Sequence, residues 1–282
     1  MVLNMTKEEF DVFFESYAKN VDEANTQNFW KLSDALILEI IKRHVPDPGQ
    51  KGVILDAGGG TARWAILLSK IYASKFTVFD LSIDMLKKAQ KNIEKERLGE
   101  RISLLKGDLA DMSNVLTESV DHVISIYSPL SFIEDRDKAL SELHRILRRG
   151  GKVLVMGHGY YNAIASKINN YRAAATELHG LDRESLVKWA PSVPVLNVFS
   201  KEGLEKMLSD AGFITKQTFG VPVFVQPGLE DFDSENKLRS EISKALEDGA
   251  FFNAVFDLEM KHNGEAYVAN RGMNIFALAE KK

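Results

Sequence analysis

VILDAGGGTARW, residues 53–64, is the most informative segment of this 282-residue chain. Its apolar start indicates a buried strand, which ends at Asp56 and runs directly into three glycines. Glycines let the backbone turn sharply and let a ligand approach without a Cβ in the way. A helix that starts at Ala62 would add unpaired N–H groups and a positive dipole end. A plain strand-to-helix turn does not need three glycines, so the segment predicts a loop that binds a carboxylate or a phosphate.

Strands and helices alternate on the C-terminal side of this loop. Short apolar runs predict four further strands, at residues 76–79, 102–105, 123–126 and 153–156. The helices expected around them cover residues 62–73, 83–97 and 135–147. Parallel strands that are joined by helical crossovers are covered on both faces. The pattern therefore predicts an α/β fold with helices on both faces of a mostly parallel sheet.

The alternation stops after Gly157. Residues 158–199 are rich in tyrosine, alanine and polar residues and carry no strand signal, which predicts a helical cap inserted after strand five. The alternation then resumes with one helix and two strands, at residues 201–211, 213–219 and 272–280. Residues 221–271 show no clear periodicity.

The N-terminal part has apolar residues at helical spacing up to Val45, where two prolines stop the helix. These residues are Phe10, Phe13, Phe14 and Tyr17, followed by Leu36, Ile37, Ile40 and Ile41. Neither this part nor the cap is needed to build the sheet. We therefore expect three units: a helical lid, a ligand-binding domain and a substrate cap, at residues 1–45, at 46–157 with 200–282, and at 158–199.

Composition and charge exclude several classes of function. The net charge of −4 and the pI of about 5.9 do not suit a surface that neutralises many phosphates, so no nucleic acid partner is expected. The chain has 0 cysteines, which excludes disulfides, thiolate metal sites and cysteine nucleophiles, and we expect no metal. No apolar run approaches the roughly 20 residues of a membrane span. Without a signal-peptide pattern at the N-terminus, we expect a cytoplasmic protein with no membrane partner; the oligomeric state is not indicated.

Acidic residues follow two further predicted strands. Asp80 lies at the tip of strand two, where a carboxylate can accept hydrogen bonds from both hydroxyls of a ribose. Asp108 lies just past strand three, where it can accept from an adenine amino group while Leu109 packs on the ring. Each signal alone is weak, since Asp80 could equally cap a helix. Together with Asp56 they fall at three strand ends on one edge of the sheet.

The glycine loop, Asp80, Asp108 and the run 120–156 resemble the class I, Rossmann-like S-adenosylmethionine-dependent methyltransferases, in their broad small-molecule branch. The resemblance is good over residues 53–157 and looser beyond them. It implies a seven-stranded sheet whose last strand runs antiparallel, with S-adenosylmethionine as the cofactor. One departure is Ala62, where the usual loop has a further glycine; we expect alanine to be tolerated there, at the start of the helix.

The resemblance also implies a set of cofactor-binding residues. Gly58 and Gly60 would lie against the methionine part, Asp80 would bind the ribose, and Asp108 with Leu109 would hold the adenine. The full candidate set is Asp56, Ala57, Gly58, Gly60, Asp80, Leu81, Asp108, Leu109, Tyr127 and Tyr17.

The predicted function is methyl transfer from S-adenosylmethionine to an unidentified small-molecule substrate. A non-catalytic protein that binds S-adenosylmethionine is the alternative, because a fold alone does not give a function. A nicotinamide-dependent oxidoreductase is less favoured, since its fingerprint needs glycine at the position of Arg63. A phosphate-binding nucleotide loop would need Gly-Lys-Ser/Thr, which does not follow Gly60.

The catalytic residue is left unknown, with two weak candidates. Tyr127 follows strand four, and His158 follows strand five with a pKa suited to a base. A hydrogen-bonded surface histidine is the more ordinary interpretation of His158. Aromatic residues of the two covering segments could line a substrate pocket or form a small core of their own. They are Tyr17, Trp30, Tyr160, Tyr161, Tyr171 and Trp189.

Overall fold

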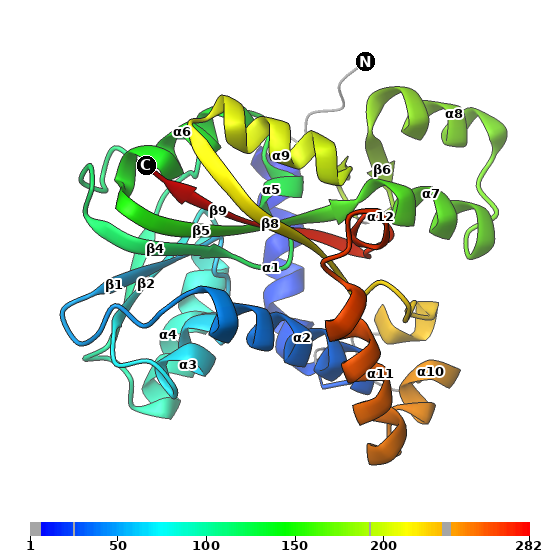
Figure 1. Ribbon diagram of the computed structural model, residues 1–282, viewed down its shortest axis with the longest axis horizontal. Helices are drawn as coiled ribbons and strands as arrows, with labels where there is room; N and C mark the ends of the chain where they lie inside the picture. The colour runs from blue at the N-terminus through cyan, green and yellow to red at the C-terminus, as the bar shows by residue number, and fades with distance from the viewer. Residues whose placement is uncertain (1–6, 25, 192, 233–237) are drawn as a thin grey trace.

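One sheet with helices on both faces forms the centre of the molecule (Figure 1). The computed structural model describes residues 7–24, 26–191, 193–232 and 238–282. Five parallel strands follow the predicted segments: β1 (Val53–Ala57), β2 (Lys75–Asp80), β3 (Ile102–Lys106), β4 (Val120–Ser125) and β5 (Leu147–Gly159). Their order is β3-β2-β1-β4-β5. The chain adds strands on one side of β1 and then on the other, so a crevice opens beyond the ends of β1 and β4.

The last two strands close the sheet as the resemblance implies. β9 (Asn274–Lys281) pairs antiparallel with β5 on one side and with β8 (Phe213–Val221) on the other. The helices that cover the sheet are α3 (Arg63–Ser69), α4 (Ile83–Glu96), α5 (Pro129–Phe132), α6 (Arg136–Ile146) and α9 (Lys201–Asp210). Figure 1 shows α3 and α4 on one face and α6 and α9 on the other. The predicted α/β class is confirmed.

The cap differs from the expectation. It contains α7 (Tyr160–Asn169) and α8 (Ala175–Glu184), but also two strands, β6 (Leu186–Lys188) and β7 (Val195–Phe199). The described residues therefore form a sheet of nine strands rather than seven, and the prediction of a purely helical cap was wrong. β7 forms because it pairs with the end of β5, where His158 lies opposite Val198. Strands this short depend on such a partner and leave little periodicity in the sequence.

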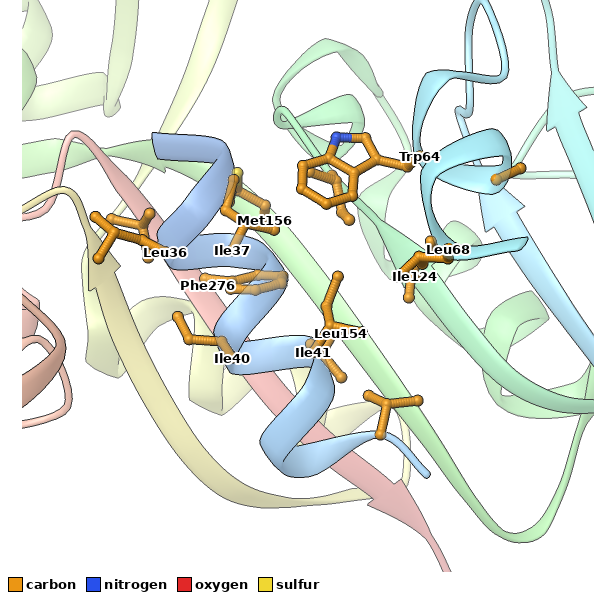
Figure 2. Packing of buried hydrophobic residues seen from close by; sticks show 14 of the residues in the cluster. Leu36, Ile37, Ile40, Ile41, Trp64, Leu68, Ile124, Leu154, Met156 and Phe276 are labelled. Atoms are coloured by element: carbon orange, nitrogen blue, oxygen red, sulfur yellow. The ribbon is translucent and has the colours of Figure 1, made fainter. Parts of the chain in front are cut away.

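The N-terminal part forms α1 (Lys7–Ala24) and α2 (Asn28–His44), which behave differently. α2 is part of the main core: Leu36, Ile37, Ile40 and Ile41 are fully buried. Figure 2 shows them packed against side chains from the sheet and from α3, namely Trp64, Leu68, Ile124, Leu154, Met156 and Phe276. Truncating one such side chain to alanine costs about 2–5 kcal/mol of stability. Only α1 remains as a candidate lid.

The sequence left residues 221–271 unassigned. Their described part contains a short 3₁₀ turn and three helices: η1 (Leu229–Phe232), α10 (Glu241–Ala245), α11 (Gly249–His262) and α12 (Ala266–Ala269). Glu259 of α11 is fully buried and accepts hydrogen bonds from the N–H groups of Val223, Phe224 and Val225 at 2.8, 2.8 and 2.9 Å. The Trp30 indole donates to the carbonyl of Asp231 at 2.7 Å. These bonds fix the segment to α2 and to the end of β8.

None of the helices in these described ranges combines the length and the apolar character needed to cross a membrane.

Candidate functional site

The glycine loop is held between the tip of β2 and the start of α5. The N–H groups of Gly58 and Gly59 donate to the carbonyl of Phe79 at 2.7 and 3.3 Å. Gly58 has a φ of +69°, and a Cβ there would lie 2.5 Å from the Cβ of Pro129. The loop therefore needs glycine at this position for both its backbone angle and its close packing.

Ala62 is not the first residue of the helix, as the sequence suggested, but its N-cap. Its φ is +65°, in the left-handed region, and α3 begins at Arg63. Glycine adopts this conformation freely, whereas an L-residue with a Cβ loses roughly 1–2 kcal/mol. Ala62 thus occupies a strained turn and not the first turn of the helix. The left-handed backbone angle explains why the methyltransferases that this loop resembles usually have glycine at this position.

Asp80 connects the loop to the tip of β2. Its Oδ2 accepts from the Gly60 N–H at 2.8 Å, and its Oδ1 accepts from the Ser82 N–H at 2.8 Å. Burial raises the pKa of Asp80 above its usual value, while these backbone donors act in the opposite direction. Each carboxylate oxygen can accept a second hydrogen bond. Asp80 is therefore placed as the sequence predicted, beside the loop and with acceptor capacity left.

Asp56 lies beneath the loop instead of facing a ligand. It is 1% exposed, and a Cβ on Gly59 would lie 2.6 Å from its Cγ. Burial raises the pKa of Asp56 to about 7, and a hydrogen bond from the backbone of Ala65 opposes that shift. The buried Oδ2 has no hydrogen-bond partner among the described residues. This position suits support of the loop better than a contact with a ligand's ammonium group.

The loop after β3 borders the glycine loop. Leu109 is 9% exposed, and its Cδ1 would lie 3.9 Å from a Cβ on Gly58, so its side chain borders the glycine loop. The exposed Asp108 accepts from the Ala110 N–H at 2.8 Å. Leu81, at the tip of β2, is 43% exposed.

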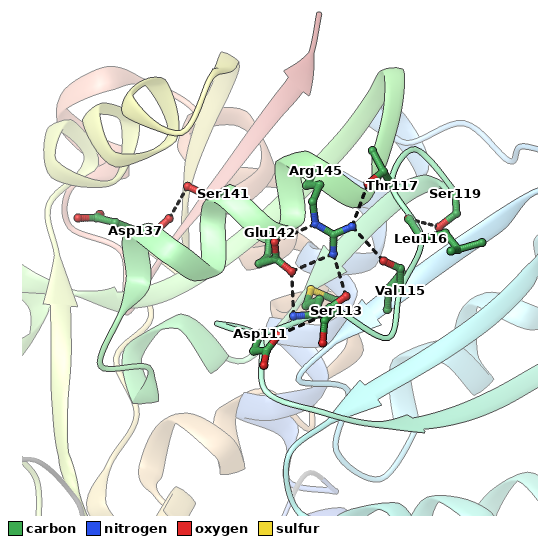
Figure 3. A network of polar contacts seen from close by, with 11 residues as sticks. Asp111, Ser113, Val115, Leu116, Thr117, Ser119, Asp137, Ser141, Glu142 and Arg145 are labelled. Carbon is green, nitrogen blue, oxygen red and sulfur yellow. Dashed lines mark hydrogen bonds and ion pairs between the residues drawn. The ribbon is translucent and has the colours of Figure 1, made fainter.

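Arg145 of α6 holds this loop in place. Figure 3 shows its guanidinium bound to Glu142 and to the loop, including the carbonyl of Val115 at 3.0 Å and the hydroxyl of Thr117 at 3.1 Å. It also donates to the carbonyl of Met112 at 2.8 Å. A bidentate arginine gives a surface loop a defined position.

Tyr127 lies at the end of β4 in a strained backbone. Its φ is +59° and that of Ser128 is +66°, which is uncommon for residues other than glycine and often marks a functional site. The Tyr127 hydroxyl donates to Asp34 of α2, and burial raises the pKa of Tyr127 well above its ordinary value. The other carboxylate oxygen of Asp34 pairs with Arg63. The phenol is therefore protonated at neutral pH.

Arg63 and Asp34 were not among the predicted site residues, and Trp30 was named only as a possible pocket-lining aromatic. The Arg63 guanidinium carbon lies 5.6 Å from the ring centroids of both Trp64 and Tyr127, and Trp30 lies 5.7 Å from Tyr127, edge to face. These residues come from α2, α3 and the end of β4. The sequence shows each of them, but it does not show that the fold brings them together.

α1 lies across the carboxyl edge of the sheet. The hydroxyl of Thr61, in the glycine loop, donates to Asp22 of α1 at 2.7 Å, and Asn92 of α4 donates to both. Towards its N-terminal end, Phe14 of α1 contacts Phe132 of α5, with ring centroids 5.4 Å apart. Tyr17 of α1 is 45% exposed. The helix thus joins the glycine loop to the segment after β4.

His158 lies at the end of β5, in contact with the cap. Its backbone N–H donates to the Ser131 hydroxyl at 3.0 Å, and its ring centroid lies 6.5 Å from that of Trp189. Burial lowers the pKa of His158 to about 4, so the imidazole is neutral and weakly basic at neutral pH. Tyr160 and Trp189 pack on the buried side chains of the cap, as the small-core interpretation predicted, whereas Tyr161 is half exposed.

Comparison with known proteins agrees with this geometry. Residues 54–151 match the family model described as a methyltransferase domain. The demethylmenaquinone methyltransferase of Alkalihalophilus pseudofirmus is 29% identical over 157 residues, which is 55% of this chain and 64% of that protein. The ubiquinone/menaquinone biosynthesis C-methyltransferase of Ruegeria sp. is 30% identical over 112 residues, which is 39% of this chain and 43% of that protein. The chain thus spans less than two thirds of these relatives.

A solved structure extends the likeness over more of the fold. The geranyl diphosphate C-methyltransferase of Streptomyces coelicolor A3(2), in complex with Mg²⁺, geranyl diphosphate and S-adenosyl-L-homocysteine, superposes with a TM-score of 0.57 at 14% identity. The superposition covers 88% of this chain and 79% of that one. Such low identity shows the fold alone. The chain thus shares the Rossmann-like α/β fold of that methyltransferase, and residues 54–151 within it match a methyltransferase domain.

Proposed function

We propose that this protein binds S-adenosylmethionine at the carboxyl edge of β1, β2 and β3 and transfers its methyl group to a small-molecule acceptor. The observation that carries the proposal is the bond between Asp80 and the glycine loop. The bond joins Asp80 at the tip of β2 to the glycine loop that follows β1, where a Cβ on Gly58 or Gly59 would clash with its neighbours. The strand order reverses beside β1, which is where ligands bind in such sheets. We also propose a cytoplasmic location, and from the net charge of −4 we expect no nucleic acid partner.

The residues present fit this cofactor. Asp80 has free acceptor capacity for the two ribose hydroxyls, and Leu109 offers an apolar surface for the adenine. Asp108, Leu81 and the loop glycines complete the proposed site. When bound, S-adenosylmethionine supplies a methyl group that its sulfonium already activates. The protein then has to align an acceptor and keep water out.

Neither candidate catalytic residue is suited to act as a strong base at neutral pH. His158 has a pKa of about 4, and the Tyr127 phenol is protonated and donates to Asp34. We propose that Tyr127 lines the place where the methyl group meets the acceptor, because it ends the strand beside β1. α1 and the cap border the same edge, and we propose that the acceptor enters between them.

A thermal-shift screen tests the cofactor. S-adenosylmethionine and S-adenosylhomocysteine should raise the melting temperature, and NAD should not, since a ligand that binds only the folded state stabilises it. Stabilisation by NAD alone would reject the assignment. Formation of S-adenosylhomocysteine with added acceptors then separates catalysis from mere binding. The relatives named for demethylmenaquinone make that compound the first acceptor to test.

A further inference from the structure

Two buried hydrogen-bond donors lie beside the glycine loop. Within the described part of the chain, neither the Arg63 Nη1 nor the Trp64 Nε1 has an acceptor within hydrogen-bond distance. Trp64 is only 5% exposed, so water does not replace the missing partner easily. An unsatisfied buried donor costs about 1–3 kcal/mol, and more when it is charged. Two such donors on successive residues indicate a place that a ligand completes.

The surroundings hold these donors in a fixed orientation. The Nη2 of Arg63 pairs with Asp34, and the other oxygen of Asp34 accepts from the Tyr127 hydroxyl. Both oxygens of Asp34 are therefore engaged, and Asp34 pairs with only one edge of the guanidinium. The guanidinium carbon lies 5.6 Å from the centres of the Trp64 and Tyr127 rings. The guanidinium that carries the unpaired Nη1 thus lies beside the Trp64 ring.

The group that best fits the unpaired donors of Arg63 and Trp64 is a carboxylate. Arginine and indole groups only donate, so their partner has to accept, and a guanidinium favours a negative charge. Only two residues, Thr61 and Ala62, separate Arg63 from the last glycine of the loop. In the proposed function, that loop lies against the amino-acid part of the cofactor, which ends in a carboxylate.

We propose that Arg63 and Trp64 bind the carboxylate of the amino-acid part of S-adenosylmethionine, with Asp34 as the positioning residue of the guanidinium. This inference rests on the proposed function, since it needs the cofactor to occupy the loop. It assigns a role to two residues that the sequence did not select for binding. It also explains why two donors are buried without partners in a folded protein.

The test compares two ligands that differ in this group. S-adenosylhomocysteine carries the amino-acid carboxylate, whereas methylthioadenosine keeps the adenosine and the sulfur and lacks it. Calorimetry should show that Arg63→Met weakens S-adenosylhomocysteine at least tenfold and changes methylthioadenosine less than twofold. Trp64→Phe keeps an aromatic ring but removes the indole N–H, so it should weaken S-adenosylhomocysteine by about threefold to tenfold. Arg43→Met, at an exposed ion pair of α2, is the matched control and should change neither.

The outcomes separate this inference from the proposed function. If the wild-type protein binds neither ligand, the cofactor assignment itself fails. If it binds both, and Trp64→Phe and Arg63→Met weaken them equally or leave both unchanged, the carboxylate assignment is overturned. Trp64→Phe keeps the test decisive if Arg63→Met does not fold, because it leaves the ion pair to Asp34 in place.

Discussion

The Oδ2 of Asp80 accepts a hydrogen bond from the Gly60 N–H at 2.8 Å, although twenty residues separate them in the sequence. The bond connects the tip of β2 with the loop that follows β1. It sets the distance between the two segments proposed to hold the ribose and the methionine part of the cofactor. A change at Asp80 should therefore affect the loop as well as the ribose contacts.

The first prediction concerns Asp80→Ala. Charge-assisted hydrogen bonds are worth roughly 1.5–3 kcal/mol each, so the loss of the ribose contacts should weaken S-adenosylhomocysteine at least tenfold. Calorimetry on the folded variant measures this effect. Asp84→Ala removes a carboxylate two residues beyond Ser82, where it pairs with Lys87 on the surface, and should bind normally. Wild-type affinity in Asp80→Ala would mean that Asp80 accepts hydrogen bonds from the backbone but does not bind the ribose.

The second prediction concerns Gly58→Ala. The added Cβ would meet Pro129 at 2.5 Å while the backbone keeps a φ of +69°, so the loop has to move. We expect no measurable binding of S-adenosylhomocysteine and a lower melting temperature. Gly99→Ala is the matched control, because nothing lies within 4 Å of a Cβ there. Equal binding by both variants would contradict the position of the loop in the site.

The sequence was sufficient for the five parallel strands and for the residues at their tips. Apolar runs of four or five residues that end in glycine or aspartate mark a buried parallel strand and its carboxyl end, and parallel strands bring those ends to one edge. The position of Asp80 beside the glycine loop is predictable on this ground. The position of Asp56 at the same edge is predictable as well, but the loop that covers it is not.

The rest depends on contacts between distant segments. Arg63 and Asp34 lie on different helices, and only the packing of α2 against the sheet brings them together. In the sequence, Arg63 indicates only that the dinucleotide fingerprint is absent, because that fingerprint needs glycine at this position. β7 exists because the end of β5 offers it a partner, and Glu259 is buried because three backbone N–H groups converge on it. No local pattern encodes such relationships.

The third prediction concerns the pH dependence of stability through Asp56. The folded protein keeps the proton on Asp56 up to about pH 7, whereas the unfolded chain releases it near the ordinary pKa of 3.8. The folded state binds more protons between these values, so this contribution to stability is complete below about pH 4 and is lost as the pH rises through 7. Asp56→Asn should remove that loss, which is on the order of 2 kcal/mol between pH 5 and pH 8. Urea unfolding of both ligand-free proteins at the two pH values measures it; parallel pH profiles would contradict the buried, protonated state.

The fourth prediction concerns Glu259→Gln. The buried carboxylate accepts three backbone hydrogen bonds, and an amide would turn an NH₂ group towards at least one of those donors. We expect a loss of about 2–4 kcal/mol in the free energy of unfolding, measured in urea. Glu241→Gln changes a carboxylate that is 91% exposed and should cost less than about 0.5 kcal/mol. A cost at Glu259 no larger than this control would show that the three bonds contribute little.

The last prediction is that α1 closes over the bound cofactor. Among its described side chains only Ala18 is buried, so the helix is weakly held and should open locally without unfolding the sheet. Its attachment at the site is the bond between Asp22 and Thr61 of the glycine loop, and a ligand in that loop should strengthen it.

We expect S-adenosylhomocysteine to slow tryptic cleavage at Lys19 of α1 by fivefold or more. Cleavage within the cap should slow as well, because α1 contacts Phe132, which packs on the buried residues of the cap. Cleavage at Lys206, an exposed residue of α9 on the other face of the sheet, is the internal control and should not change. Asp22→Ala should still bind the ligand but lose much of the protection at Lys19. Equal cleavage at Lys19 with and without saturating ligand, while the ligand raises the melting temperature, would reject a lid function for α1.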